Sequence, residues 1–243
     1  MVFSASMYML TAPYVNEHVL HIAPATPSTL VAGAIVAAGA GLIADLDTAA
    51  SRASSALGPL TRMLSKVVTI LSGGHRYGTH SLLAIAAVWL GTWRLVDRWG
   101  HSLPVMLCLT AFLISFAVRE LLDSDKLPAP FVLGLSVVGG LACLAISPSY
   151  LWLQWAIVIG YTLHLVADSL TTEGVRLLWP LTSRTFGLKG FDSESLPARV
   201  ITWAGGGVLV LLVLVQLVLP QLAANHPELL RQSSALRQLV AYH

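Results

Sequence analysis

Long runs of hydrophobic residues, separated by short polar stretches, dominate the chain. No Asp, Glu, Lys or Arg occurs in residues 18–44, 127–167 or 200–227, which are runs of 27, 41 and 28 residues. A helix that crosses the hydrocarbon core of a bilayer needs about 20 predominantly apolar residues. Each run is therefore long enough to hold at least one membrane-spanning helix.

Breaks inside these runs set the expected helices. As one helix the 41-residue run would be about 60 Å long, too long for a single crossing, and Ser147-Pro148-Ser149 divides it. The pattern predicts spans at 28–44, 81–99, 103–118, 131–146, 150–167 and 200–219, with 1–15 as a half-span interrupted at Pro13. We therefore expect an all-α fold, a polytopic transmembrane helical bundle of about five to six spans.

The domain organisation follows from the same pattern. Residues 1–224 form one membrane-embedded helical domain, and the polar residues 225–243 form a tail. The segment 28–44 is rich in Ala and Gly, and small residues let helix backbones approach closely. We therefore expect this helix to pack at the centre of the bundle.

Composition narrows the class of protein further. Charged residues make up 11% of the chain and hydrophobic residues 56%, whereas an ordinary globular domain has about 25% charged residues. A soluble enzyme, a secreted module and a disordered chain are excluded. The net charge of +2 is not concentrated in a basic run, so we expect the lipid bilayer, and no nucleic acid, as a partner.

Basic residues in the connections predict the orientation. Alternating crossings place the connections after spans 28–44 and 150–167 on one side, and Lys and Arg are enriched on the cytoplasmic side of membrane proteins. These connections carry Arg52, Arg62, Lys66, Arg76, Arg176, Arg184, Lys189 and Arg199, with Arg119 and Lys126 on the same side, against Arg94 and Arg98 opposite. We expect a multi-pass membrane protein with this side facing the cytoplasm, although Arg231 and Arg237 fall on the other side.

Ionisable residues gather where the predicted spans end. Such residues in or beside a membrane span are energetically costly and usually functional. They form three sets, namely Asp45 and Asp47, then His75, Arg76 and His80, and finally His164 and Asp168. The crossing count puts all three sets on the cytoplasmic face.

The spacings of these residues favour metal binding. His164 and Asp168 are four apart, so on a helix they lie on one face and can share an ion, while Thr171 continues that face and could orient a ligand. Asp45 and Asp47 converge only if their helix has already ended. Mixed imidazole and carboxylate ligands suit zinc, or manganese, better than calcium.

Simpler explanations apply to each residue taken alone. A His or Asp at a membrane interface is often an anchor or a helix cap, and Arg76 could serve only as a cytoplasmic anchor. Thr79 could cap the helix that starts near residue 81. Six ligand-type residues on one face together favour a metal site over these explanations.

Three ordered motifs resemble those of one family. The segment from Gly74 to Ser81 resembles the Gly-His-Arg-x-x-Thr-His-Ser motif of the YdjM-like family of inner-membrane, metal-dependent hydrolases. His164-x3-Asp168-x2-Thr171-x2-Gly174-x5-Pro180 is similar to that family's second signature, and Asp45-Leu46-Asp47 to its Pro-Asp-hydrophobic-Asp motif. The resemblance spans about residues 31–180 and implies a membrane-embedded hydrolase of the cell inner membrane. A weaker likeness to zinc-dependent phospholipase C points towards phosphoesters.

The chain departs from the family pattern at several positions. Ala44 stands where the family usually has Pro, and Thr48 where it often has His. The family's N-terminal Thr-His pair has no counterpart, and residues 1–15 look like such a helix without its beginning. Either the true start lies upstream of Met1, or one or two ligands are absent, and a single metal site then remains.

The sequence supports three functional hypotheses. The first is a metal-dependent phosphoesterase for a lipid or lipid-linked substrate, using zinc, or manganese or magnesium. The expected ligands are Asp45, His75, His80, His164 and Asp168, with Thr79 and Thr171 orienting them. Asp47 would act as general base or further ligand, and Arg76 would neutralise the phosphate. The alternatives are a metal-ion transporter and a non-enzymatic metal-binding membrane regulator.

Overall fold

The computed structural model describes residues 1–21, 25–122, 127–146, 150–188, 190, 192 and 195–225. In chain order the elements are α1 (Val2–His18), α2 (Pro27–Ala40), η1 (Ala44–Asp47), α3 (Arg52–Ser55), α4 (Pro59–Ser72), η2 (Gly78–His80), α5 (Leu82–Trp99), α6 (Leu103–Leu121), α7 (Ala129–Ala145), α8 (Leu151–Ser169), α9 (Leu196–Val213), η3 (Leu214–Val218) and α10 (Leu219–Asn225). Within the described ranges the only β feature is an isolated bridge between Val175 and Phe186. The predicted all-α bundle is confirmed.

Some of the predicted features lie outside the described residues. These are the polar tail from residue 226 onward, the turn at 147–149, and the basic residues Lys126, Lys189, Arg231 and Arg237. The structure therefore describes the helices, most of the connections and all three sets of ionisable residues.

Proline and hydroxyl residues define where several helices begin. Pro27 and Pro59 occupy the first turns of α2 and α4, where a missing N–H costs nothing. Ser81 caps α5, because its side chain accepts a hydrogen bond from the backbone N–H of Ala84 at 3.2 Å. The prediction that Thr79 caps this helix is wrong, since its hydroxyl turns instead towards Asp47.

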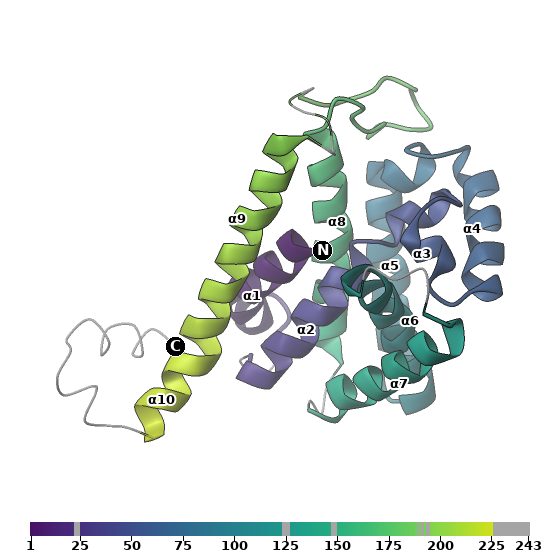
Figure 1. Ribbon diagram of the computed structural model, residues 1–243. Coiled ribbons are helices and arrows are strands. Elements are labelled where there is room, and N and C mark those ends of the chain that lie inside the picture. The colour runs from purple at the N-terminus through teal and green to yellow at the C-terminus, as the bar shows by residue number, and fades with distance from the viewer. Residues whose placement is uncertain are drawn as a thin grey trace.

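Helix α2 lies at the centre, as its small residues predict. It packs against α1, α6 and α8 (Figure 1). A Cβ added at Gly39 would lie 2.0 Å from the Leu113 carbonyl oxygen, and one added at Gly160 would lie 2.3 Å from the Ala37 carbonyl oxygen. These close backbone approaches are open only to glycine, so they fix α2 against α6 and α8.

Four segments are long and apolar enough to cross a membrane by length and composition. They are Pro27–Asp47, Leu103–Leu121, Leu151–Ser169 and Leu196–Leu222, and Ala129–Ala145 is a shorter apolar helix. Helix α5 carries Arg94, Asp97 and Arg98 near its end. Among the described residues, the expected five to six spans thus correspond to four long helices, the shorter α7 and the more polar α5.

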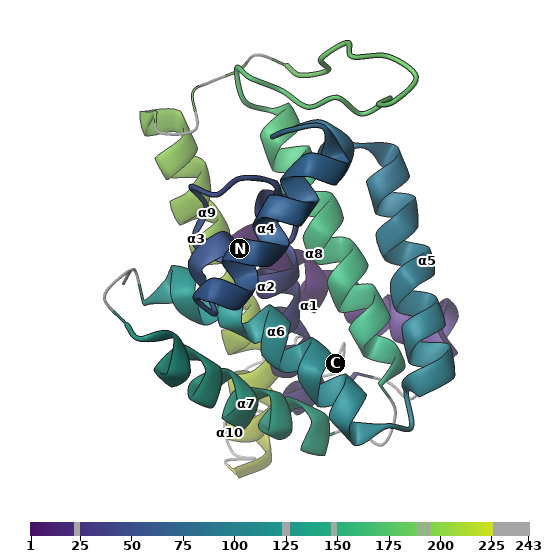
Figure 2. The same cartoon turned by 90° about the vertical axis from the view of Figure 1, so that its right-hand side faces the viewer.

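The ends of several helices meet at one end of the bundle. Helices α9 and α5 flank α8 on opposite sides, and the loop after α8 arches over the ends of α8 and α5 (Figure 2). The backbone N–H of Leu82, at the start of α5, donates to the Leu177 carbonyl in this loop at 2.9 Å. Beneath the loop, η1 and η2 contact each other, and these turns carry Asp45, Asp47 and His80.

Candidate metal centre

Three chain segments deliver the ionisable residues to one place. Helix α2 ends at Ala40, and Asp45 and Asp47 follow on the short turn η1. His80 lies on η2, just before α5. His164 and Asp168 lie in the last two turns of α8, where the helix carbonyls carry a partial negative charge that favours a cation.

Four side chains converge here. Asp45, His80 and His164 each offer a ligand atom, and these atoms all lie within 4.8 Å of one another. Asp168 Oδ2 lies 3.3 Å from His80 Nε2 and 3.7 Å from His164 Nε2, and His164 Nε2 lies 3.3 Å from Asp45 Oδ1. Ligand atoms of a tetrahedral zinc are roughly 3.3 Å apart, given bonds of about 2.0 Å, and these three contacts at 3.3, 3.3 and 3.7 Å are close to that separation.

Three inward-facing atoms of the described cluster lack hydrogen bonds. Within the described part of the chain, His80 Nε2, His164 Nε2 and Asp168 Oδ2 are buried and have no hydrogen-bond partner. Buried polar atoms are normally hydrogen-bonded, and each exception needs an explanation. A shared cation would satisfy all three atoms at once, so the residues present fit a metal ion.

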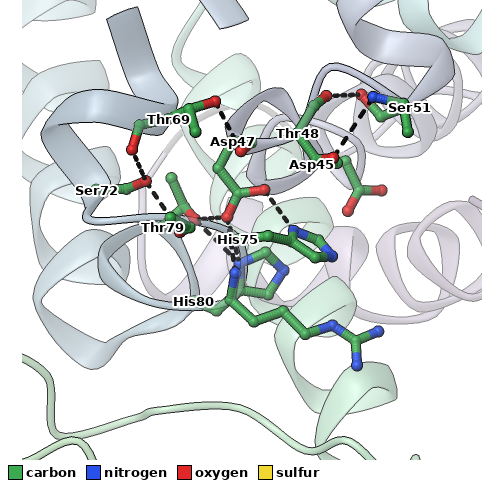
Figure 3. Close-up of polar contacts among 12 residues, drawn as sticks. Asp45, Asp47, Thr48, Ser51, Thr69, Ser72, His75, Thr79 and His80 are labelled. Carbon is green, nitrogen blue, oxygen red and sulfur yellow. Dashed lines mark hydrogen bonds and ion pairs between the residues drawn. The ribbon is translucent and has the colours of Figure 1, made fainter. Parts of the chain in front are cut away.

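Asp47 holds the surrounding loop together from within the protein. Its side chain is fully buried, and its carboxylate lies between His75, Thr79 and His80 (Figure 3). His75 Nδ1 lies 2.7 Å from Oδ1, the Arg76 backbone N–H donates to Oδ2 at 3.0 Å, and the Thr79 hydroxyl also donates to Oδ2. Asp47 thus acts on the cluster from the side of His80 that faces away from Asp168.

His80 connects Asp47 to the cluster. Its Nδ1 lies 3.0 Å from Thr79 Oγ1 and 3.3 Å from Asp47 Oδ2, while its Nε2 faces Asp168. Burial by itself lowers the pKa of His80, but the carboxylates of Asp168 and Asp47 outweigh it and raise the pKa to about 9. An acceptor on Nδ1 that leaves Nε2 to face the ion is the usual arrangement of a metal-binding histidine.

His75 and Arg76 lie at the edge of the cluster. The His75 ring packs edge-on against His80 with centroids 5.6 Å apart, and its side chain is 42% exposed. Arg76 Nε lies 3.2 Å from Asp168 Oδ2, and its Nη1 lies 2.5 Å from Glu173 Oε2. The structure thus gathers Asp45, His80, His164 and Asp168, and leaves His75 and Arg76 beside them.

Thr171 and Ala44, which the sequence motifs also single out, contact the residues around the cluster. Thr171 is buried, and its hydroxyl donates to the backbone carbonyl of Asp168 at 2.8 Å, so it secures the end of α8. Ala44, which replaces the family's usual Pro, is buried in a small cluster with Tyr161 and Leu165. Asp45 and Asp47 approach the cluster from different sides because the helix has ended before them.

Some residues of the site have no clear sequence signal. The Tyr161 hydroxyl donates to the Thr79 carbonyl, and Thr69 Oγ1 donates to the Asp47 carbonyl at 2.8 Å. Tyr161 precedes His164 by three residues and so shares its helix face. This spacing could have identified Tyr161 from the sequence. Glu173 directly precedes Gly174 of the second motif, but only the fold brings its carboxylate to Arg76.

Comparison with known proteins gives one match. The profile of the family described as YdjM inner membrane protein matches residues 2–227. No curated protein and no solved structure matches the chain. The family match extends beyond the range 31–180 over which the motifs carry the resemblance.

Proposed function

The chain belongs to the YdjM inner membrane protein family, and we propose that it is a metal-dependent hydrolase that cleaves a phosphoester of a lipid or lipid-linked substrate. One observation carries the proposal. Two imidazoles and two carboxylates from three chain segments converge at the end of α8, and three of their inward atoms have no hydrogen-bond partner among the described residues.

The proposed ligands are Asp45, His80, His164 and Asp168. A set of nitrogen and carboxylate oxygen donors suits zinc, with manganese or magnesium as the alternatives. A bound divalent ion would lower the pKa of a coordinated water to about 7 and polarise the scissile phosphoester. His75 Nδ1 lies 2.7 Å from Asp47 Oδ1 and its side chain is 42% exposed, so we assign it to the edge of the site.

Asp47 and Thr79 position His80 in this proposal. The sequence suggests Asp47 as a general base or further ligand, but both of its carboxylate oxygens already accept hydrogen bonds. Its buried carboxylate and the Thr79 hydroxyl fix the His80 ring with Nε2 towards Asp168. Residues that orient a ligand in this way commonly change metal affinity by 10- to 100-fold when replaced.

Arg76 is the proposed phosphate-binding residue. Its planar guanidinium suits paired contacts with phosphate oxygens, and it reaches Asp168 on one side and the largely exposed Glu173 on the other. An anionic substrate would take the place of the Glu173 carboxylate at the outer edge. The site lies at the ends of the candidate spans Pro27–Asp47 and Leu151–Ser169, a depth that favours a lipid substrate.

Orientation and location belong to the same proposal. Basic residues are enriched in the connections on the side of the site, including Arg52, Arg62, Lys66 and Arg176. By the rule that such connections stay in the cytoplasm, the protein crosses the inner membrane several times and the site faces the cytoplasm.

The test uses purified, zinc-loaded protein in proteoliposomes. Phosphate or headgroup release is measured from a phospholipid, a prenyl phosphate and a model phosphodiester. We expect turnover of at least one, lost in Asp45→Asn and His164→Ala and retained in Asp97→Asn, a carboxylate at the exposed end of α5. Bound zinc without any turnover would instead support a metal-binding regulator, and metal flux that depends on Asp168 would support a transporter.

A further inference from the structure

Helix α4 has its polar and apolar faces reversed relative to a helix of a soluble protein. Thr61, Ser65 and Ser72 are 0%, 1% and 6% exposed and face the protein. The opposite face consists of large apolar side chains at helical spacing, and several of them are more than half exposed. This apolar stripe comprises Leu60, Met63, Leu64, Val67, Ile70 and Leu71, and all of these except Leu64 are more than half exposed. An outward apolar stripe of this kind matches an apolar surrounding.

The polar face of α4 is attached to the candidate metal centre. Helix α4 contacts η1 and η2, the two turns that carry Asp45, Asp47 and His80. Thr69 Oγ1 donates to the Asp47 carbonyl at 2.8 Å, and the Ser72 hydroxyl donates to the Gly74 carbonyl at 3.2 Å in the loop that leads to His75 (Figure 3). The position of α4 is therefore tied to that of the proposed ligands.

Helix α4 is too short to cross a bilayer. It has 14 residues and is about 21 Å long, whereas the hydrocarbon core is about 30 Å thick. Gly58 and Gly73 bound it with positive φ angles of 65° and 80°, so the chain turns sharply at both ends. Arg62 and Lys66 are exposed beside the apolar stripe.

We propose that α4 is an in-plane membrane helix whose apolar stripe lies in the lipid and whose Arg62 and Lys66 bind the headgroups of anionic lipids. Apolar residues on one face with Lys and Arg at its border are typical of helices at the membrane interface. The positive charges complement anionic lipid, which selects lipid over a second protein as the occupant. This places the metal centre at headgroup depth, and it does not depend on hydrolysis by the site.

The test measures the depth of α4 in the full-length protein, reconstituted in nanodiscs that hold one copy. Met63→Cys or Ile70→Cys in a Cys108→Ala/Cys143→Ala background carries an environment-sensitive fluorophore. Ser183→Cys, exposed in the loop after α8, is the matched control. We expect lipids brominated in their acyl chains to quench both α4 probes, and aqueous iodide to quench the Ser183 probe preferentially.

A second comparison tests the charges. Brominated phosphatidylglycerol should quench the Met63 probe more than brominated phosphatidylcholine, since each basic residue near an anionic surface enriches such lipid roughly fivefold. Arg62→Gln/Lys66→Gln should abolish this preference and leave metal content unchanged. Iodide quenching of the α4 probes equal to that of the control would overturn the proposal. So would shielding from iodide that appears in crowded vesicles but not in single-copy discs, because a second copy would then cover α4.

Discussion

Replacing Asp47 by Asn should weaken metal binding without removing any of the four proposed ligands. The Asp47 carboxylate accepts hydrogen bonds from the Arg76 backbone N–H and the Thr79 hydroxyl, and it pairs with His75 and His80. Asn keeps one acceptor oxygen and turns an NH₂ group towards these donors. One donor then loses its partner, and the His80 ring is no longer held with Nε2 towards Asp168.

The size of the effect follows from the role of Asp47. Loss of a partner that orients a metal ligand costs 10- to 100-fold in affinity, which is about 1.4–2.8 kcal/mol of binding free energy. Competition with a zinc-binding dye measures the affinity in detergent-purified protein, and circular dichroism checks that the helices are intact. Asp97→Asn, at the exposed end of α5, should bind zinc as the wild type does. A folded Asp47→Asn protein with wild-type affinity would refute the reasoning.

Four further predictions follow from the site and the packing. Zinc must displace a proton from His80, because the pKa of this residue in the metal-free protein is raised to about 9. Zinc affinity measured by dye competition should therefore rise about tenfold per pH unit up to that pH. A flat profile between roughly pH 6 and pH 8, where a group with this pKa is protonated, would contradict this. In the metal-free protein the same shift stabilises the fold fully below the unfolded-state pKa of about 6.5, and this stabilisation should be lost as the pH rises through about 9. Gly160→Ala should lower thermal stability by about 1–3 kcal/mol, because its Cβ would meet the Ala37 carbonyl, whereas Gly134→Ala, with open space around it, should not. Arg76→Lys should raise KM for a phosphoester, whereas even Arg76→Gln should change the metal content little, since Arg76 lies beside the ligands without being one. A loss of metal in Arg76→Lys would contradict the assignment of Arg76 to the substrate.

The helices of the bundle were predictable because an uncharged run leaves few alternatives. In lipid, backbone polar groups must be satisfied within the segment, so an apolar run long enough to cross forms a helix. The predicted span 103–118 corresponds to α6 (Leu103–Leu121), and 150–167 corresponds to α8 (Leu151–Ser169). The grouping of the three ionisable sets also followed from the sequence, since alternating crossings decide which helix ends share a face.

Helix α4 and the role of Asp47 were not predictable in this way. Arg62 and Lys66 interrupt the apolar pattern of residues 52–76, so the sequence predicts a basic connection there and gives no sign that the polar residues Thr61 and Ser65 face the protein. Asp45 and Asp47 have the same chemistry and differ by two positions. Only the turn η1 decides that Asp47 is buried under His75 and His80 while Asp45 faces His164.

The most direct test of the proposed metal centre is the metal content of purified protein, measured by elemental analysis. The wild type should carry a stoichiometric divalent ion, with zinc as the expected metal. His164→Ala should lose it, while His101→Ala, an exposed histidine between α5 and α6, should keep it. Equal metal content in wild type and His164→Ala, in protein with intact helices, would contradict the assignment of Asp45, His80, His164 and Asp168 as a metal site.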